Sequence, residues 1–171
     1  MQIEPGEANE LREKLASPTW EIPPNEVVCA AAALVNSAEL GLVYSERSSG
    51  ADGSRWSVFA VVGNADLLVI EADSPLENWC GDQRQAPQDG AVKRARRVPA
   101  ATLGSIDVAS VRSVATDMGG GWAYRVEWSL RWRNGDEPVR LSPISRTGEQ
   151  RFGAIRAAIA AASEADDGRS N

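Results

Sequence analysis

Large apolar side chains alternate with polar or small ones along residues 122–133. The apolar positions are Trp122, Tyr124, Val126, Trp128, Leu130 and Trp132. Successive side chains of a β-strand point to opposite faces, so the alternation predicts a strand with one buried and one solvent-exposed face. We expect the apolar face to be protein core rather than the lining of a ligand cavity. At about 3.3 Å per residue the strand would be roughly 40 Å long, which predicts a bend or a β-bulge.

Shorter apolar segments separated by turn residues predict further strands. These segments are residues 40–44, 56–62, 67–72, 92–98, 109–115 and 139–144. The dipeptides Gly63-Asn64 and Asn134-Gly135 are typical of tight turns in β-hairpins. Residues 48–54, rich in serine and glycine, predict a flexible loop, and residues 73–91 predict a longer one.

The C-terminal region predicts one amphipathic helix. Three large apolar residues recur there at spacings of three and four and would form a stripe: Phe152, Ile155 and Ile159. Thr147 and Gln150 have the spacing of a capping box, so we expect Thr147 to be the N-cap residue.

The N-terminal region is less clearly patterned. Glutamates recur at every third position between residues 4 and 13, which predicts one short helix in an arm over residues 1–24. Residues 25–35 fit two structures, because their alanines and a capping asparagine favour a helix whereas their valines suit a strand. We therefore expect an arm, a β domain over residues 25–163 and a disordered acidic tail over residues 164–171.

The composition limits the function. With 171 residues, 43% of them apolar and 25% charged, the chain resembles one ordinary soluble domain. It contains no histidine, which excludes Ser-His-Asp and Cys-His catalysis and histidine-based metal sites. The two cysteines, Cys29 and Cys80, lie far apart in sequence and favour free thiols in a reducing compartment. We find no signal-peptide pattern and no apolar segment of bilayer length, so we expect a cytoplasmic protein, and the arginine and alanine bias is typical of GC-rich bacterial genomes.

Charge is unevenly distributed along the chain, whose net charge is −6. Residues 1–91 carry 5 basic and 15 acidic side chains, whereas residues 92–156 carry 12 basic and 6 acidic ones. The basic half could bind an acidic partner, or the two halves could neutralise each other within one fold.

The most concentrated positive charge lies in residues 92–98. This segment contains the candidate binding cluster Lys93, Arg94, Arg96 and Arg97. The cluster could bind an anionic membrane surface, a nucleic acid or an acidic protein segment. Alternatively, its charges protect an edge strand from pairing with other chains. A nucleic acid is the least favoured partner, because the sequence pI is about 4.8 and nucleic-acid-binding domains are usually basic.

The sequence predicts no catalytic, metal or cofactor site. Three carboxylates near a turn, Asp66, Glu71 and Asp73, could suggest metal binding or acid–base chemistry. However, Asp66 suits the turn itself, and Glu71 would point to the outer face of its strand. Cys80 has no basic neighbour in the sequence that would activate a thiol. We therefore expect a non-enzymatic protein without a cofactor.

About seven strands in hairpins followed by one capped helix resemble the pleckstrin-homology-like (PH-like) superfamily over residues 25–163. The segment from Arg97 to Val108, Arg-Val-Pro-Ala-Ala-Thr-Leu-Gly-Ser-Ile-Asp-Val, also resembles a strand connection of its bacterial members. The resemblance implies a mainly β fold, an antiparallel and partly open barrel of about seven strands capped by one C-terminal helix. A lipocalin-like or other small barrel closed by a helix is the main alternative.

The best-known PH-like activity is binding of phosphoinositide headgroups through basic residues that flank the first hairpin. The matching residues 36–55 contain only Arg47 and Arg55 as basic side chains. Other relatives bind peptides or act as protein-interaction scaffolds. We therefore expect a module that binds a protein or peptide along an exposed sheet edge, with binding to an anionic membrane or another polyanion through the basic cluster as the alternative. Small-ligand binding or catalysis at the barrel mouth is a third hypothesis, and the oligomeric state stays open.

Overall fold

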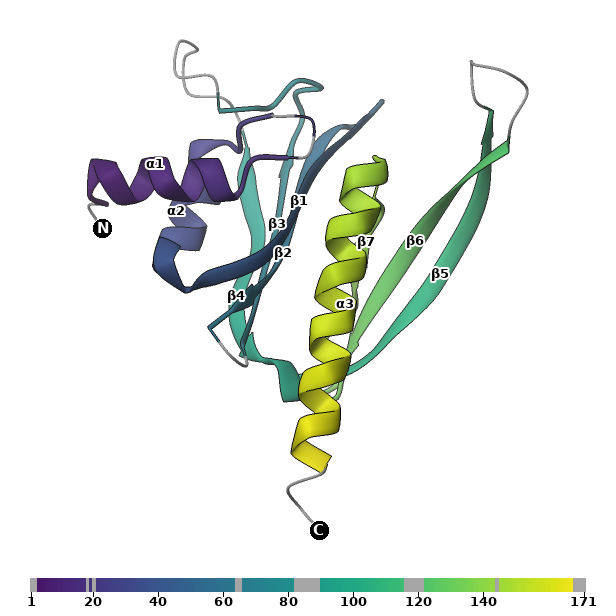
Figure 1. Ribbon diagram of the computed structural model, residues 1–171. Helices are drawn as coiled ribbons and strands as arrows, with labels where there is room; N and C mark the ends of the chain where they lie inside the picture. The colour runs from purple at the N-terminus through teal and green to yellow at the C-terminus, as the bar shows by residue number, and fades with distance from the viewer. Residues whose placement is uncertain are drawn as a thin grey trace.

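Seven antiparallel strands and three α-helices make up the part of the chain that the computed structural model describes (Figure 1). That part comprises residues 3–17, 19, 21–63, 66–81, 90–115, 122–143 and 145–167, with side chains described for all but 113–115, 122–124 and 162–167. The strands are β1 (Leu40–Gly50), β2 (Gly53–Val62), β3 (Asp66–Ser74), β4 (Ala91–Pro99), β5 (Leu103–Ala115), β6 (Trp122–Trp132) and β7 (Val139–Leu141). The helices are α1 (Pro5–Lys14), α2 (Asn25–Ala32) and α3 (Arg146–Asp167), with short 3₁₀-helices η1 (Ser37–Glu39) and η2 (Ala100–Thr102).

The strands form two open sheets, in the orders β1-β2-β3-β4 and β5-β6-β7. The seven antiparallel strands and the C-terminal helix agree with the sequence prediction, but the fold is mixed α/β rather than mainly β, and the sheets do not close into a barrel. Figure 1 shows them meeting near η2 and diverging toward the opposite end. β7 has only three residues, all paired with β6, and is therefore too short to continue along β1 and close the structure.

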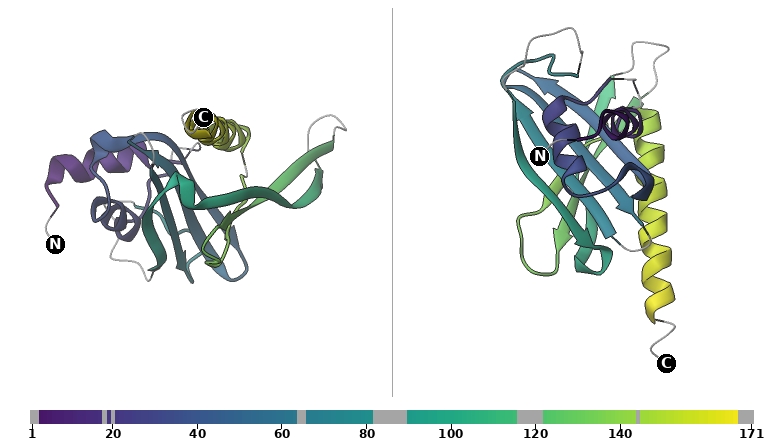
Figure 2. Two further views of the ribbon diagram at one scale, coloured as in Figure 1. Left: turned by 90° about the horizontal axis from the view of Figure 1, so that it is seen from below. Right: turned by 90° about the vertical axis from the view of Figure 1, so that its left-hand side faces the viewer.

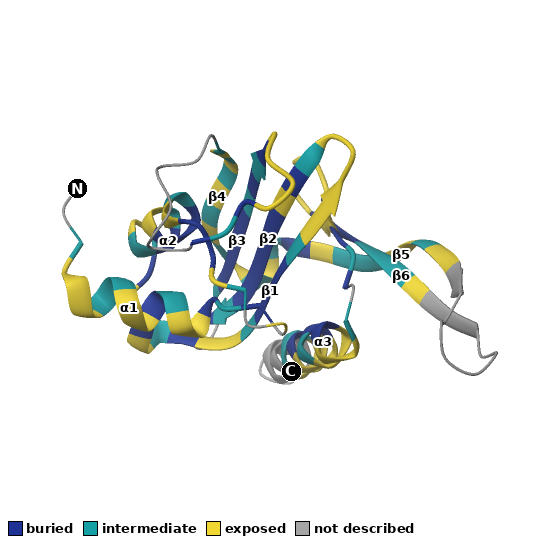
Figure 3. Cartoon of the chain, turned by 90° about the horizontal axis from the view of Figure 1, so that it is seen from above, coloured by how far each residue is buried: buried dark blue, intermediate teal, exposed yellow. Residues whose placement is uncertain are grey.

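The first sheet is buried on both faces. The helices α1 and α2 cover one face, and the second sheet together with α3 covers the other (Figures 2 and 3). On β2, Trp56 and Val58 pack beneath the helices, whereas Phe59 belongs to the core beneath the second sheet. All three side chains are 0% exposed. Because β2 and β3 are covered on both faces, their sequences are nearly continuous runs of apolar residues.

The N-terminal region packs onto the first sheet through α1 and α2. The short helix expected within residues 1–24 is present as α1, and its Leu11 is fully buried. Residues 25–35, which fitted either a helix or a strand, begin with helix α2. Val27, Val28 and Ala31 are the buried residues of α2, so the valines that suited a strand form the apolar stripe of a helix.

Residues 48–54, predicted to form a flexible loop, instead continue the first hairpin. β1 runs to Gly50, β2 starts at Gly53, and these two glycines are register partners. Gly53 has a φ of +110°, and a Cβ there would lie 2.0 Å from the carbonyl oxygen of Ser74. Glycine is therefore required at this tight turn, where composition alone predicted a loop.

Trp79 anchors the connection between β3 and β4, which the sequence predicted as a long loop. Its side chain is 1% exposed in the core beneath α1 and α2. Its carbonyl oxygen accepts a hydrogen bond of 2.8 Å from Nε1 of Trp56. Gly90 lies against the indole, since a Cβ on Gly90 would be 2.1 Å from Cζ2 of Trp79. Residues 82–89 of this predicted loop lie outside the described residues.

β5 and β6 form a long ribbon that extends away from the first sheet (Figures 1 and 2). β5 begins at Leu103, before the predicted start at residue 109. The register shifts lie on β5, between Leu103 and Ser105 and between Val108 and Ser110, whereas β6, for which a bend or bulge was predicted, is paired without an extra residue.

The predicted apolar face of β6 is core at its C-terminal end. Leu130 and Trp132 are buried, and Trp128 packs against the same core. The side chains of Trp122 and Tyr124 lie outside the described residues. The prediction that the apolar face of β6 is core therefore holds for the end of the strand that pairs with β7.

A buried carboxylate, Glu46 of β1, binds the beginning of α3. Ser145, which precedes α3, donates its backbone N–H and its hydroxyl to Oε1 of Glu46 at 3.2 and 2.8 Å. Ser145 Oγ accepts the N–H of Gly148 at 2.9 Å. This is the pattern of a capping box whose carboxylate comes from a distant strand. The predicted N-cap at Thr147 is therefore wrong, because Ser145 is the residue within reach of Glu46.

The predicted apolar stripe of α3 is confirmed. Phe152 and Ile155 are buried, and the Phe152 ring lies 5.8 Å from that of Tyr44 and 5.6 Å from that of Trp128. The helix continues to Asp167, so residues 164–167, which were expected to belong to a disordered tail, are helical. Residues 168–171 of the expected tail lie outside the described residues.

The contact between Gly90 and Trp79 predicts a stability effect. We expect Gly90→Ala to lower the free energy of unfolding by about 1–3 kcal/mol, because the added methyl group overpacks a buried indole. Gly50→Ala is the matched control, since a Cβ there has no atom within 4 Å and the change should stay within about 0.5 kcal/mol. Urea unfolding measures both. Equal effects of the two substitutions would show that Gly90 does not support Trp79.

Candidate functional site

The structure places the predicted basic cluster on β4, at one edge of the first sheet. The strand separates its four side chains. The register is irregular at Lys93, which lies in a bulge between paired residues. Beyond the bulge, alternation puts Arg94 and Arg96 on the face toward the second sheet and Arg97 on the opposite face. The four charges therefore do not form one continuous patch.

On the face toward the second sheet, Arg94 connects β4 to the β6–β7 turn. It lies 3.5 Å from the carboxylate of Glu71 on β3 and 2.9 Å from that of Glu137 in the turn. Burial raises the pKa of Glu71, and the positive charge of Arg94 opposes that rise. The positive charge of Arg94 is thus balanced by the carboxylates of Glu71 and Glu137.

Arg96 makes a second connection to the same turn. Its guanidinium lies over the Trp132 ring at 4.1 Å and pairs with the carboxylate of Asp136. The side chain of Asn134 and the guanidinium of Arg96 both lower the pKa of Asp136. A stacked and paired guanidinium joins two layers of the fold, which is a structural role.

On the opposite face, Arg97 lies between two carboxylates, 2.7 Å from Asp66 and 3.1 Å from Glu39. The backbone N–H of Asn36 and the Arg97 guanidinium lower the pKa of Glu39. Lys93 is exposed and forms no ion pair with a described residue. Three of the four predicted binding residues are therefore occupied within the protein.

The three carboxylates near the β2–β3 turn do not converge. Each pairs with a different arginine: Asp66 with Arg97, Glu71 with Arg94, and Asp73 with Arg55. Glu71 faces the second sheet instead of solvent, which corrects the expected outward orientation, because both faces of the first sheet are covered. Among the described residues, no group of histidine, cysteine, aspartate and glutamate side chains could hold a metal ion. Cys29 and Cys80 are both free, as predicted.

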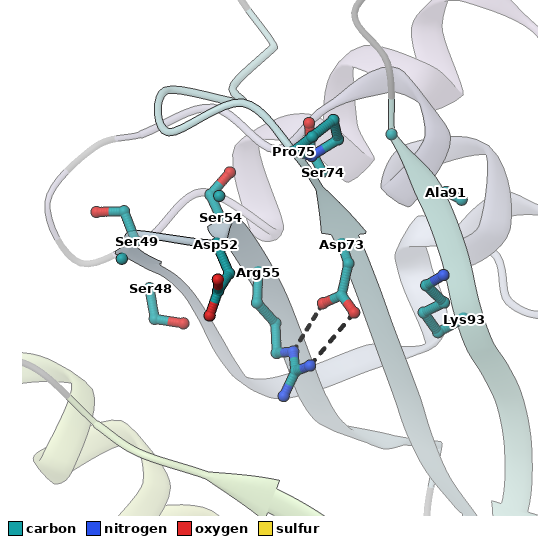
Figure 4. Close-up of a pocket in the computed structure, with 13 residues that line it drawn as sticks. Ser48, Ser49, Asp52, Ser54, Arg55, Asp73, Ser74, Pro75, Ala91 and Lys93 are labelled. Carbon is teal, nitrogen blue, oxygen red and sulfur yellow. Dashed lines mark hydrogen bonds and ion pairs between the residues drawn. The ribbon is translucent and has the colours of Figure 1, made fainter.

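A polar pocket of about 700 Å³ lies beside the β1–β2 hairpin (Figure 4). Arg55 and Asp73 point toward each other across β2 and β3, with bonds of 2.7 Å to Oδ1 and 3.2 Å to Oδ2. Lys93 lines the same pocket from β4. Arg47, the other arginine of this region, pairs with Glu21. Both arginines that the PH-like resemblance assigned to headgroup binding are therefore engaged by carboxylates.

A groove of about 560 Å³ separates β5 from α3. Its lining consists of Leu103, Gly104, Ser105 and Ile106 on β5, Gly153, Arg156, Ala157, Ile159 and Ala160 on α3, and Arg133. Glycine and alanine on the helix leave room for a polypeptide backbone, and the isoleucines offer apolar contacts. Arg156 lies over the Trp128 ring at 4.0 Å, so its charge is held beside the groove.

β5 borders this groove with an unpaired edge. The strand order β5-β6-β7 leaves one side of β5 without a neighbouring strand. From the segments that the structure describes, no backbone hydrogen bond reaches that side. Such an edge presents a row of N–H and C=O groups that can pair with another extended chain.

The polar face of the β5–β6 ribbon carries arginines that are not adjacent in sequence and were not predicted as a site. Arg125, Arg131 and Arg133 occupy odd positions, and Arg112 lies directly opposite Arg125 in the register. Arg131 pairs with Asp107 at 3.1 Å. Neither Arg112 nor Arg125 forms an ion pair with a described residue. The alternation that predicted β6 also contained this signal, because it placed the arginines together on the polar face.

Comparisons with protein-family models, with curated proteins and with solved structures find no match to this chain. Within the described residues, no helix is long and apolar enough to cross a membrane. The candidate site therefore depends on the geometry of β5, α3 and the ribbon.

The contacts of the basic cluster predict different roles for its members. We expect Arg96→Ala to lower the free energy of unfolding by about 1–2 kcal/mol, because it removes both the stacking on Trp132 and the ion pair with Asp136. The control Lys93→Ala should change it by less than about 0.5 kcal/mol. Urea unfolding of both variants measures the difference. An effect of Arg96→Ala as small as that of the control would contradict the structural role.

Proposed function

We propose that this protein is a non-enzymatic interaction module that binds an extended protein segment along the free edge of β5. The observation that carries the proposal is the unpaired strand edge beside a groove bounded by α3. A strand edge recognises a partner through its backbone, and the neighbouring groove adds side-chain selectivity.

The groove suits the dimensions of an added strand. A segment paired with β5 would lie about 4.8 Å from it, on the side where α3 forms the opposite wall. Gly153, Ala157 and Ala160 on α3 have small side chains and therefore leave space for the added strand. Ile106 and Ile159 would bury apolar side chains from alternate positions of the segment.

Both walls of the groove are held in place by the fold. β5 is paired with β6 from Leu103 to Ala115. α3 is fixed by the hydrogen bonds from Ser145 to Glu46 and by the buried Phe152. A site formed before binding loses less conformational entropy when the partner arrives, which favours this surface over a mobile one.

We also propose that the fold is a variant of the PH-like architecture. The support is the chain order, a four-stranded sheet, then a three-stranded sheet, then one helix. The departures are the open sheets and the helices α1 and α2 that cover the first sheet. Peptide recognition and scaffolding are the PH-like activities most consistent with an exposed strand edge.

Binding to an anionic membrane or another polyanion through Lys93, Arg94, Arg96 and Arg97 remains the alternative. The ion pairs of the three arginines weigh against it, because a polyanion would have to displace carboxylates already in contact. A small ligand in the pocket beside the first hairpin is also less favoured, because Arg55 there already pairs with Asp73.

Peptide display on the whole protein tests the proposal. We expect a library of random dodecapeptides to yield binders whose affinity falls at least tenfold in Ala157→Trp, because the indole would fill the groove. Ala154→Trp is the matched control, since Ala154 is also exposed on α3 but does not line the groove. Fluorescence anisotropy gives the Kd, and thermal unfolding checks that both variants are folded. Unchanged affinity in Ala157→Trp would exclude the groove, and the absence of any binder would reject the module.

A further inference from the structure

We propose that the segment bound along β5 is acidic and alternates carboxylate with apolar side chains. This specificity rests on the function proposed above, and it follows from the two faces of the β5–β6 ribbon. One face carries unpaired positive charge, and the other carries exposed apolar side chains.

The polar face of the ribbon has an excess of positive charge. Three arginines, Arg112, Arg125 and Arg131, share it with two carboxylates, Asp107 and Glu127. Both carboxylates are already engaged. Asp107 pairs with Arg131 at 3.1 Å, and Glu127 pairs with Arg140 at 3.1 Å while accepting a hydrogen bond from Ser110. The excess therefore remains on Arg112 and Arg125.

Arg112 and Arg125 are directly opposite each other on adjacent strands. Like charges in this position destabilise a strand pair, and no carboxylate among the described residues pairs with either guanidinium. A third strand beside β5 would lie one strand spacing, about 4.8 Å, from Arg112 and about twice that from Arg125. Arginine and glutamate side chains span these distances, so a carboxylate on the added strand would contact both.

The opposite face of the same ribbon is apolar and incompletely covered. Val108 and Val111 are 52% and 56% exposed, and their register partners are Trp128 and Val126. Ile106 continues this apolar surface into the groove beside α3. An added strand with apolar side chains on this face would remove the valines from water.

One strand can satisfy both faces only if its side chains alternate. Successive residues of a strand point to opposite faces, so carboxylates would meet the arginines while apolar groups met the valines. A segment with the same composition in two blocks would place half of each kind on the wrong face. Charge complementarity and the period of two together define the partner as an acidic, amphipathic strand.

Four fluorescein-labelled octapeptides with blocked termini test this specificity by fluorescence anisotropy on the whole protein. They are alternating Glu-Val, Glu and Val in two blocks, alternating Lys-Val, and alternating Ser-Val. We expect alternating Glu-Val to bind at least tenfold more tightly than the block or lysine peptide and more tightly than the serine peptide. Added salt should weaken its binding.

The variant Arg112→Ser/Arg125→Ser should weaken binding of alternating Glu-Val between about twofold and thirtyfold, the range expected for two exposed ion pairs. Its affinity for alternating Ser-Val should not change. Arg146→Ser, which removes an exposed arginine at the start of α3, serves as the control and should leave both affinities unchanged.

The outcomes separate this proposal from the proposed function. Equal affinity for the glutamate and serine peptides, both lost in Ala157→Trp, would overturn the acidic specificity and retain the strand edge. If display-selected peptides bind but none of the alternating peptides does, the acidic specificity would likewise be overturned and the strand edge retained. Tighter binding of a uridine dodecamer through the same two arginines would overturn the proposal and identify the basic face as a nucleic-acid surface.

Discussion

The carboxylate of Glu46 is the interaction on which the arrangement of the last helix depends. Glu46 is only 3% exposed, and a buried carboxylate is costly unless hydrogen bonds and positive charge compensate it. Ser145 donates two hydrogen bonds, Tyr44 donates another at 3.1 Å, and the positive end of the α3 dipole lies beside the carboxylate. Separating α3 from β1 would remove the two hydrogen bonds from Ser145 and the helix dipole from this carboxylate, which favours the docked position.

The position of α3 determines the candidate binding groove. From Ser145 the helix runs along β1, places Phe152 between Tyr44 and Trp128, and then presents Ala157 to β5. The distance between β5 and α3, which form the groove, is therefore set by the contact of Ser145 with Glu46 at the other end of the helix. β5 pairs only with β6 and not with the preceding strand β4, which leaves β5 with a free edge. The open architecture and the proposed recognition of an extended segment have the same structural origin.

Local patterns in the sequence predicted the strands and the apolar stripe of α3, because alternation and helical periodicity report burial directly. They failed where the structure depends on residues distant in sequence. Thr147 had the spacing of a capping box, but the carboxylate of Glu46 selects Ser145. Composition could not distinguish a loop from a connection anchored by Trp79. The charge of residues 93–97 was evident, but the carboxylates that occupy the arginines come from other elements.

Two glycines of α3 provide the most direct test of the role of Glu46. A Cβ on Gly148 would lie 2.7 Å from Oε1 of Glu46, whereas a Cβ on Gly153 has no atom within 4 Å. Urea unfolding of Gly148→Ala and Gly153→Ala compares them at helical positions. We expect Gly153→Ala to raise the free energy of unfolding by about 0.5–1 kcal/mol through helix propensity, and Gly148→Ala to lower it because the methyl group displaces the carboxylate. Equal stabilisation by both substitutions would show that Glu46 does not hold α3 in place.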